Sequence, residues 1–127
     1  MRKNYSSGLE MEAQVGYSRA VQVGGSLYVS ATAPVDDDQN LVGSTGYQQA
    51  QFALQKIEKT LRAAAFNLDD VVFVRFYFSP KIVHGDAYRA FTEKFSDIRP
   101  AIAVVNVNSW SIPNMLLEIE VQAHRDL

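Results

Sequence analysis

Cysteine is absent from this sequence of 127 residues. Without cysteine the chain cannot form a disulfide, use a thiolate nucleophile or hold a cysteine-ligated zinc or iron–sulfur centre. Long apolar runs are also missing, because no stretch reaches the roughly 18 apolar residues of a membrane-spanning helix and the polar first residues do not resemble a signal peptide. We therefore expect a cytoplasmic protein with no membrane partner.

An excess of charge of either sign is lacking as well. The formal net charge is −2 and the pI is about 5.6. The chain therefore has no overall positive electrostatic potential that would attract a polyphosphate, and we expect no nucleic-acid partner. His84 and His124 have no further ligand at metal spacing, and no nucleophile elbow or phosphate-binding glycine loop occurs. The sequence therefore indicates neither a metal nor a cofactor.

The composition that remains is that of an ordinary globular protein, with 47% hydrophobic and 20% charged residues. The length fits one domain spanning residues 1–127. Periodicity predicts strands at 17–23, 27–33, 71–79, 101–107 and 115–123, with a short edge strand at 41–42. It predicts one helix from a Ser44 or Thr45 cap to Ala65 and a second from Val83 or Asp86, the latter a candidate cap, to Phe95. Residues 1–14 show no period and are expected to be irregular.

This order of elements predicts an α+β domain in which both helices cover one face of a mixed sheet of five or six strands. The strand at 27–33, the helix after it and the strand at 71–79 predict a right-handed crossover between parallel neighbours.

The last predicted strand separates the two faces of the sheet. Leu117, Ile119 and Val121 point to one side, and Glu118 and Glu120 point to the other. Carboxylates are rarely buried unless they are paired, so the acidic side must meet water, a ligand or a partner.

Alternation places a mixture of apolar, hydroxyl and charged side chains on this uncovered face. A surface of this kind on a small protein usually marks an interface, so we predict a symmetric homo-oligomer. The residues assigned to it are Tyr28, Ser30, Thr32, Phe73, Arg75, Tyr77, Ile102, Val104, Leu116, Glu118 and Glu120.

Several short motifs follow one another between residues 16 and 123. They include Gly16-Tyr17-Ser18-Arg19-Ala20, Val29-Ser30-Ala31, Asp69-Asp70-Val71-Val72, Ala87-Tyr88-Arg89-Ala90-Phe91, Arg99-Pro100-Ala101 and Leu117-Glu118-Ile119-Glu120. Together they resemble the Rid family, also called YjgF or L-PSP, whose older labels are endoribonuclease L-PSP and translation initiation inhibitor.

The resemblance implies a chorismate-mutase-like α+β subunit that forms a homotrimer, with a small-molecule ligand in clefts between subunits. The best-studied members hydrolyse reactive enamines and imines, such as 2-aminoacrylate, to keto acids and ammonia without a metal or organic cofactor. In these members an arginine directly after Pro-Ala binds the substrate carboxylate, while a tyrosine, a serine and a late glutamate surround the reacting carbon.

Carried onto this sequence, the resemblance implies that Tyr17, Ser30 and Glu120 are the catalytic residues. The position of the arginine is occupied by Ile102, and a frequent asparagine before the second-helix tyrosine is Gly85. An aliphatic side chain cannot replace the charge-assisted hydrogen bonds of a guanidinium.

The expected substrate-binding set comprises Arg75, Ile102, Val104 and Tyr88. Arg75 lies on the uncovered face by alternation, where it could supply the missing charge. Alternatively, it pairs with Glu118 or Glu120.

Three functions remain open from the sequence. The first is a cofactor-free enamine or imine deaminase of the Rid type, with a more apolar cleft and a substrate that lacks a 2-carboxylate. The second is a non-catalytic trimer that binds a metabolite in the same clefts. The third, RNA cleavage or translation inhibition, rests on the older family labels alone.

Overall fold

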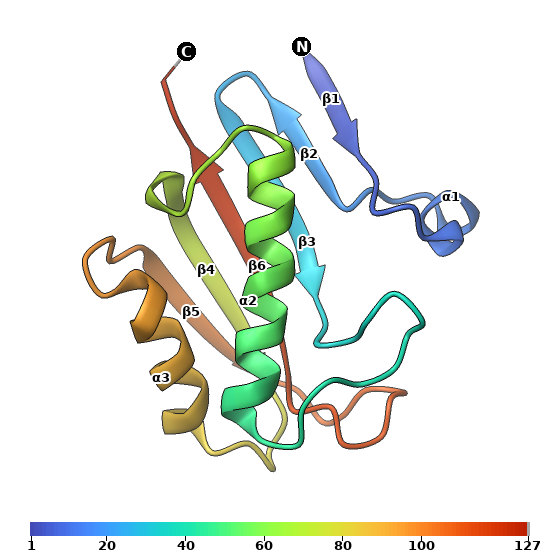
Figure 1. Cartoon of the computed structure of the whole chain (residues 1–127), viewed down its shortest axis with the longest axis vertical. Coiled ribbons are helices and arrows are strands. Elements are labelled where there is room, and N and C mark those ends of the chain that lie inside the picture. Colours follow the sequence, from blue (N-terminus) through green and yellow to red (C-terminus); the bar gives the residue numbers. More distant parts are fainter. Residues whose placement is uncertain (127) are drawn as a thin grey trace.

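The structure of the chain, a computed structural model, describes residues 1–126. A six-stranded sheet in the order β1-β2-β3-β6-β4-β5 carries helices α2 and α3 on one face (Figure 1). The strands are β1 (Arg2–Tyr5), β2 (Ala20–Val23), β3 (Ser26–Thr32), β4 (Val71–Phe78), β5 (Ala101–Asn106) and β6 (Leu117–His124); the helices are α1 (Glu10–Val15), α2 (Gly46–Ala63), the 3₁₀ turn η1 (Leu68–Asp70) and α3 (His84–Phe95). The predicted mixed α+β fold is confirmed. No helix among residues 1–126 is long and apolar enough to cross a membrane.

Strand β6 lies in the middle of the sheet and pairs antiparallel with β3 and with β4. Leu117, Ile119 and Val121 are buried, whereas Glu118 and Glu120 are only half-buried on the opposite face. The predicted separation of the faces of this strand is therefore confirmed. Burying each large aliphatic side chain contributes roughly 1.5 to 3 kcal/mol.

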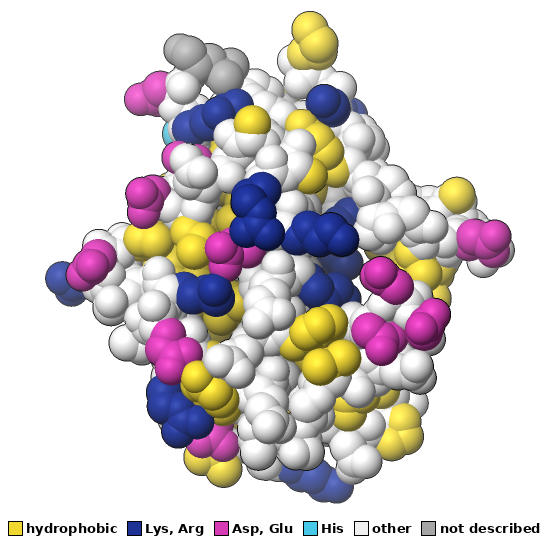
Figure 2. Space-filling model, viewed as in Figure 1, with side chains coloured by type: hydrophobic (Ala, Val, Ile, Leu, Met, Phe, Trp, Pro, Cys, Tyr) yellow, Lys and Arg dark blue, Asp and Glu magenta, His cyan; other side chains and the backbone are white. Residues whose placement is uncertain are grey.

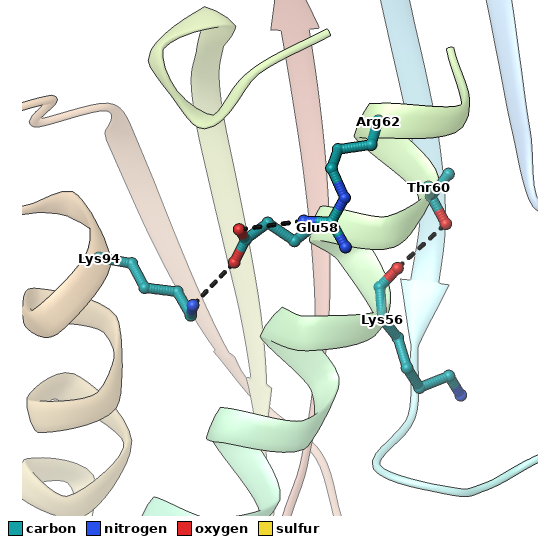
Figure 3. A network of polar contacts seen from close by, with 5 residues as sticks. All are labelled: Lys56, Glu58, Thr60, Arg62 and Lys94. Atoms are coloured by element: carbon teal, nitrogen blue, oxygen red, sulfur yellow. Dashed lines mark hydrogen bonds and ion pairs between the residues drawn. The ribbon is translucent and has the colours of Figure 1, made fainter. Parts of the chain in front are cut away.

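Helix α2 begins where the sequence predicts a cap. The Thr45 hydroxyl accepts a hydrogen bond from the Gln48 amide at 3.1 Å. On its outer side, Glu58 accepts bonds from Lys94 of α3 at 2.7 Å and from Arg62 at 3.3 Å (Figure 3). These ion pairs are partly exposed and contribute little, so the buried side of α2 holds it to the sheet.

Helix α3 packs against β4 through aromatic side chains. The ring of Phe76 lies edge-on to Tyr88 and Phe91, with centroids 5.9 and 5.3 Å away. Asp86 lies in the first turn, and the capping residue is Val83, which makes no side-chain cap bond. The predicted Asp86 cap is therefore wrong.

The amino-terminal segment is more ordered than its sequence indicates. Residues 2–5 form β1, which pairs antiparallel with β2, and residues 10–15 form α1. The expectation that residues 1–14 are irregular is therefore wrong. A short polar strand at the edge of a sheet is held by backbone hydrogen bonds, so its sequence shows no hydrophobic period. Conversely, Leu41 makes only an isolated bridge to Val35, so the predicted strand at 41–42 does not form.

The predicted crossover between parallel neighbours is also wrong in one respect. Strands β3 and β4, which α2 connects, are separated in the sheet by β6. The parallel neighbours are β4 and β5, which α3 connects. Local periodicity cannot show that the last strand of the chain inserts between two earlier ones.

Register shifts in β3 and β4 reverse the predicted faces at one end of each strand, while the rest of each strand follows the prediction. In β3 the shift lies between Val29 and Thr32, so that Thr32 is buried and Ala31 is exposed. In β4 it lies near Val71, which is buried, whereas Val72 is 49% exposed. A bulge offsets strict alternation by one residue, and nothing in these β-branched stretches marks its position.

The side chains of strand β5 also point to other faces of the sheet than predicted. Ile102 is in register with Val74 and Val104 with Phe76, both of which are buried on the helix-covered face. Ile102 and Val104 therefore do not belong to the uncovered face. Because β5 is apolar on both sides, alternation alone does not assign its faces.

The bulge in β4 generates a prediction about stability. Val71→Ala should lower the free energy of unfolding by about 1 to 3 kcal/mol, because it removes buried methyl groups. Val72→Ala should change it by no more than about 0.5 kcal/mol, because its side chain is largely in water. Urea unfolding of both variants measures the difference, and a larger loss for Val72→Ala would contradict the described register.

Candidate functional site

Three of the predicted residues meet in one place. Tyr17, Ser30 and Glu120 line a hollow of about 590 Å³, although more than 100 positions separate the first from the last. Asn4 and Glu12 from the amino-terminal segment also contribute to its wall. The hollow thus joins the amino-terminal segment to the central strands.

Glu120 is held by two neighbours on β4. Its Oε1 accepts a hydrogen bond from the Arg75 guanidinium at 2.7 Å and another from the Tyr77 hydroxyl. The bond to Glu120 raises the pKa of both Arg75 and Tyr77, so each group keeps its proton and remains a donor. Of the two alternatives for Arg75, the structure shows pairing with Glu120, through Nη1 alone, and the Arg75 side chain is 33% exposed.

The second oxygen of Glu120 has a different environment. No donor from residues 1–126 bonds to Oε2, and the side chain is 23% exposed. A carboxylate fixed through one oxygen and open at the other can accept a hydrogen bond from a water molecule and orient it. Glu120 therefore has the geometry of a water-positioning group.

Ser30 lies at the bulge of β3. Its hydroxyl donates to the Ser18 carbonyl at 2.7 Å, and its amide donates to the Arg19 carbonyl at 3.0 Å. The hydroxyl proton is therefore occupied, and the oxygen lone pairs remain to accept a bond from a ligand donor.

Tyr17 follows directly on α1, and its position depends on how that helix ends. Gly16 adopts a left-handed conformation with φ of 100°, and the amides of Gly16 and Tyr17 both donate to the Glu12 carbonyl at 2.9 Å. The Tyr17 side chain is 37% exposed and available to a ligand.

The side chain of Glu12 fixes this helix to the segment before it. Glu12 is only 4% exposed and accepts bonds from the Ser6 hydroxyl at 2.8 Å and from the amide and hydroxyl of Ser7. Burial acts to raise the pKa of the carboxyl, but the bonds from Ser7 and Ser6 outweigh it and hold the pKa below its ordinary value of 4.5.

The remaining predicted substrate-binding residues lie elsewhere on the chain. Tyr88 packs against Phe76 on the helix-covered side, and Ile102 and Val104 lie on edge strand β5. None of the three lines the hollow that contains Glu120. Within one chain, therefore, only Tyr17, Ser30, Glu120 and its partner Arg75 come together.

Tyr77, which bonds to Glu120, and Glu12, which holds α1, are among the contributors that were not predicted as site residues. Tyr77 could have been found, because it alternates with Arg75 on the same face of β4. No feature of the sequence indicated that Glu12 belongs to the site, because a buried acidic residue in a short polar helix has no characteristic spacing. Among residues 1–126, no group of three potential ligands could hold a metal ion.

Comparison with known sequences identifies relatives that span most of the chain. The profile of the family described as Endoribonuclease L-PSP matches residues 8–125. A RutC family protein of Saccharolobus solfataricus is 34% identical over 111 residues, which cover 86% of each chain. Another, from Sulfurisphaera tokodaii, is 33% identical over 106 residues, which cover 83% of this chain and 84% of the relative.

Solved structures share the same fold. The crystal structure of Rv2704 from Mycobacterium tuberculosis, a member of the YjgF/YER057c/UK114 family, superposes with a TM-score of 0.87 at 34% identity, covering 98% of this chain and 100% of the other. Yeast Mmf1 superposes with a TM-score of 0.84 over 99% of this chain and 100% of its own, and at 21% identity it supports the fold alone.

The environment of Glu12 predicts how stability depends on pH. Since its folded pKa is lowered, the ionised carboxylate stabilises the native state above pH 4.5, and this contribution is lost as the pH falls through the folded value. Glu12→Gln should therefore be less stable than the parent at pH 7, and the difference should shrink below pH 4.5. Urea unfolding at pH 7, 4 and 3 measures it. A difference that stayed constant with pH would contradict this role of the charge.

Proposed function

Because this chain belongs to the endoribonuclease L-PSP family, the family of YjgF and RutC proteins, we propose that it is a cofactor-free hydrolase that releases ammonia from a small enamine or imine. The observation that carries the proposal is the meeting of Tyr17, Ser30 and Glu120 around one hollow.

In the proposed reaction, water adds to the carbon of the C=N bond. The free Oε2 of Glu120 orients this water and accepts its proton, while Arg75 and Tyr77 hold the other oxygen in place. Glu120 returns this proton to the substrate nitrogen and then carries the proton of the new hydroxyl to the same nitrogen, so that the C–N bond breaks, ammonia leaves and a carbonyl group remains. The hydroxyl of Tyr17 donates a hydrogen bond to the substrate nitrogen, and Ser30 accepts one from it.

We further propose that the complete cleft forms between subunits of a homotrimer. Ile102 and Val104 are 47% and 38% exposed on an edge strand, on the face opposite to Glu120. They and Tyr88 could approach the hollow only from a second copy of the chain. The cleft would then combine Glu120 of one subunit with Ile102 of the next.

The residue at position 102 bears on the substrate of this proposed cleft. Ile102 offers no hydrogen bond or charge, and Arg75 is already paired with Glu120. A carboxylate directly adjacent to the C=N carbon would therefore lie against an apolar side chain, at a cost in desolvation. The site favours an enamine or imine without a 2-carboxylate.

Replacing Glu120 tests the proposed reaction. Glu120→Gln should lower kcat for ammonia release about 10²- to 10⁴-fold, because the amide cannot accept a proton from water. The assay compares enzymatically generated 2-aminoacrylate with enamines that lack a 2-carboxylate. Glu93→Gln, an equal change in charge on α3 and outside the hollow, is the matched control. Equal turnover by parent and Glu120→Gln would exclude this role.

Restoring a cation at position 102 tests the composition of the cleft. Ile102→Arg should raise kcat/KM for 2-aminoacrylate by about tenfold or more, through charge-assisted bonds to its carboxylate. Val105→Arg adds the same charge on the other face of β5, where it pairs with Tyr77, and should give no gain.

The mass of each variant must be measured alongside its activity. Light scattering should give about three times the 14.2 kDa of one chain for the parent and for both variants. A monomeric parent would contradict the proposed cleft between subunits.

A further inference from the structure

A second hollow adjoins the first, and Tyr17 lines both. It measures about 600 Å³ and lies between α1, the loop that follows β3 and the middle of α2. Two cationic side chains, Arg19 and Lys56, contribute to its wall. On the helix-covered side, Figure 2 shows basic side chains gathered along α2 and acidic ones over the loop after β3.

The two cations are only partly satisfied by the protein. Arg19 donates through one terminal nitrogen to the carbonyls of Ser30 and Ala31, at 2.9 and 3.0 Å, while its Nε is buried and has no partner within residues 1–126. Lys56 donates to the carbonyls of Ala33 and Val35 at 2.9 and 2.8 Å, which leaves one of its three N–H donors.

No residue of 1–126 forms an ion pair with Arg19 or Lys56. Burial lowers the pKa of both groups, and the charge of Arg19 lowers the pKa of Lys56 further. These effects outweigh the nearby acidic groups, Asp36, Asp37 and Glu118 for Lys56 and Tyr17, Glu12 and Glu118 for Arg19, which act to raise the two pKa values. Two neighbouring cations that are partly removed from water destabilise each other, and an anion between them would relieve the repulsion.

Four carboxylates also line this hollow, and they restrict which anion it can take. Asp36 is engaged with the amides of its own loop, and Glu118 accepts a bond from the Trp110 indole at 2.6 Å. Asp37 and Glu10 remain exposed. Such a wall repels a dianionic phosphate more strongly than a monoanionic carboxylate, so a carboxylate fits better.

We propose that Arg19 and Lys56 bind a carboxylate of the substrate that is distant from its reacting carbon. The inference rests on the proposed function, and it names the substrate class: an enamine or imine with a carboxylate at the far end of a short aliphatic spacer. Tyr17 lines both the hollow that contains the cations and the hollow that contains Glu120, so the carboxylate would occupy one hollow and the C=N carbon the other.

This arrangement accounts together for the apolar residue at position 102 and the free donors near Tyr17. A carboxylate adjacent to the C=N carbon would lie against Ile102. A distal carboxylate would instead contact the guanidinium of Arg19 and the ammonium of Lys56, which have unused N–H groups. The substrate would differ from a 2-imino acid in the length of chain between its two functional groups.

A stable probe for this site is 4-oxopentanoate, a ketone with a distal carboxylate. In titrations of the wild-type protein followed by ¹H–¹⁵N NMR, it should shift the amides of Gly8, Asp37 and Gln39 around the second hollow, together with that of Ser30. It should bind at least about tenfold more tightly than 2-pentanone, pyruvate or inorganic phosphate. Because no variant is required, this measurement does not depend on whether a substitution folds.

Lys56→Met removes the charge and keeps an unbranched side chain. It should raise the Kd for 4-oxopentanoate about tenfold or more and leave the Kd for 2-pentanone unchanged. Lys59→Met makes the same change at an exposed position on the same helix and should leave both unchanged. Thermal unfolding of both variants separates a loss of the site from a loss of the fold.

The outcomes separate this inference from the proposed function. Tight binding of 4-oxopentanoate that depends on Lys56 supports the carboxylate site, whether or not an enamine releases ammonia. If no enamine releases ammonia, only the proposed reaction is contradicted. If 4-oxopentanoate binds no more tightly than 2-pentanone, or if Lys56→Met and Lys59→Met behave alike, the inference is overturned, whatever the turnover. Tighter binding of phosphate than of 4-oxopentanoate also overturns it.

Discussion

The structure depends on the division of β6 into a buried and a half-buried face. Leu117, Ile119 and Val121 lie in the core on the side that carries α2 and α3, and their burial supplies part of the hydrophobic free energy of folding. Because alternate side chains point in opposite directions, the same packing forces Glu120 onto the other face. There the carboxylate is stabilised by Arg75 and Tyr77 from β4, so the core and the candidate site are consequences of one strand.

The rest of the site depends on irregular features around this strand. The bulge in β3 places Ser30 beside Ser18 and exposes the carbonyls of Ser30 and Ala31, to which Arg19 donates. The short helix α1 ends at Gly16 and thereby positions Tyr17. Bulges and helix ends carry functional side chains in many proteins because they redirect a side chain without disturbing the core.

Two hollows with different chemistry meet at Tyr17. One contains a carboxylate held through a single oxygen, and the other contains two cations with unused donors. Membership of the endoribonuclease L-PSP family identifies the scaffold, whereas the substrate class that we propose follows from side chains such as Ile102, Arg19 and Lys56. Arg19 and Lys56 thus line a hollow that shares Tyr17 with the hollow that contains Glu120.

The sequence by itself determined the fold class, the extent of the two long helices, the faces of β6 and the identities of Tyr17, Ser30 and Glu120 as candidates. The fold class, the helices and the faces of β6 follow from hydrophobic periodicity, a local property of the chain, whereas the three candidates follow from the resemblance of short motifs to the Rid family. Tertiary structure alone decided the insertion of β6 between β3 and β4, the bulges that bury Thr32 and Val71, and the pairing of Ile102 with Val74. It also brought Arg19 and Lys56 to one hollow. Strand order, register and contacts between distant side chains are set by how the whole core packs, and no local period records them.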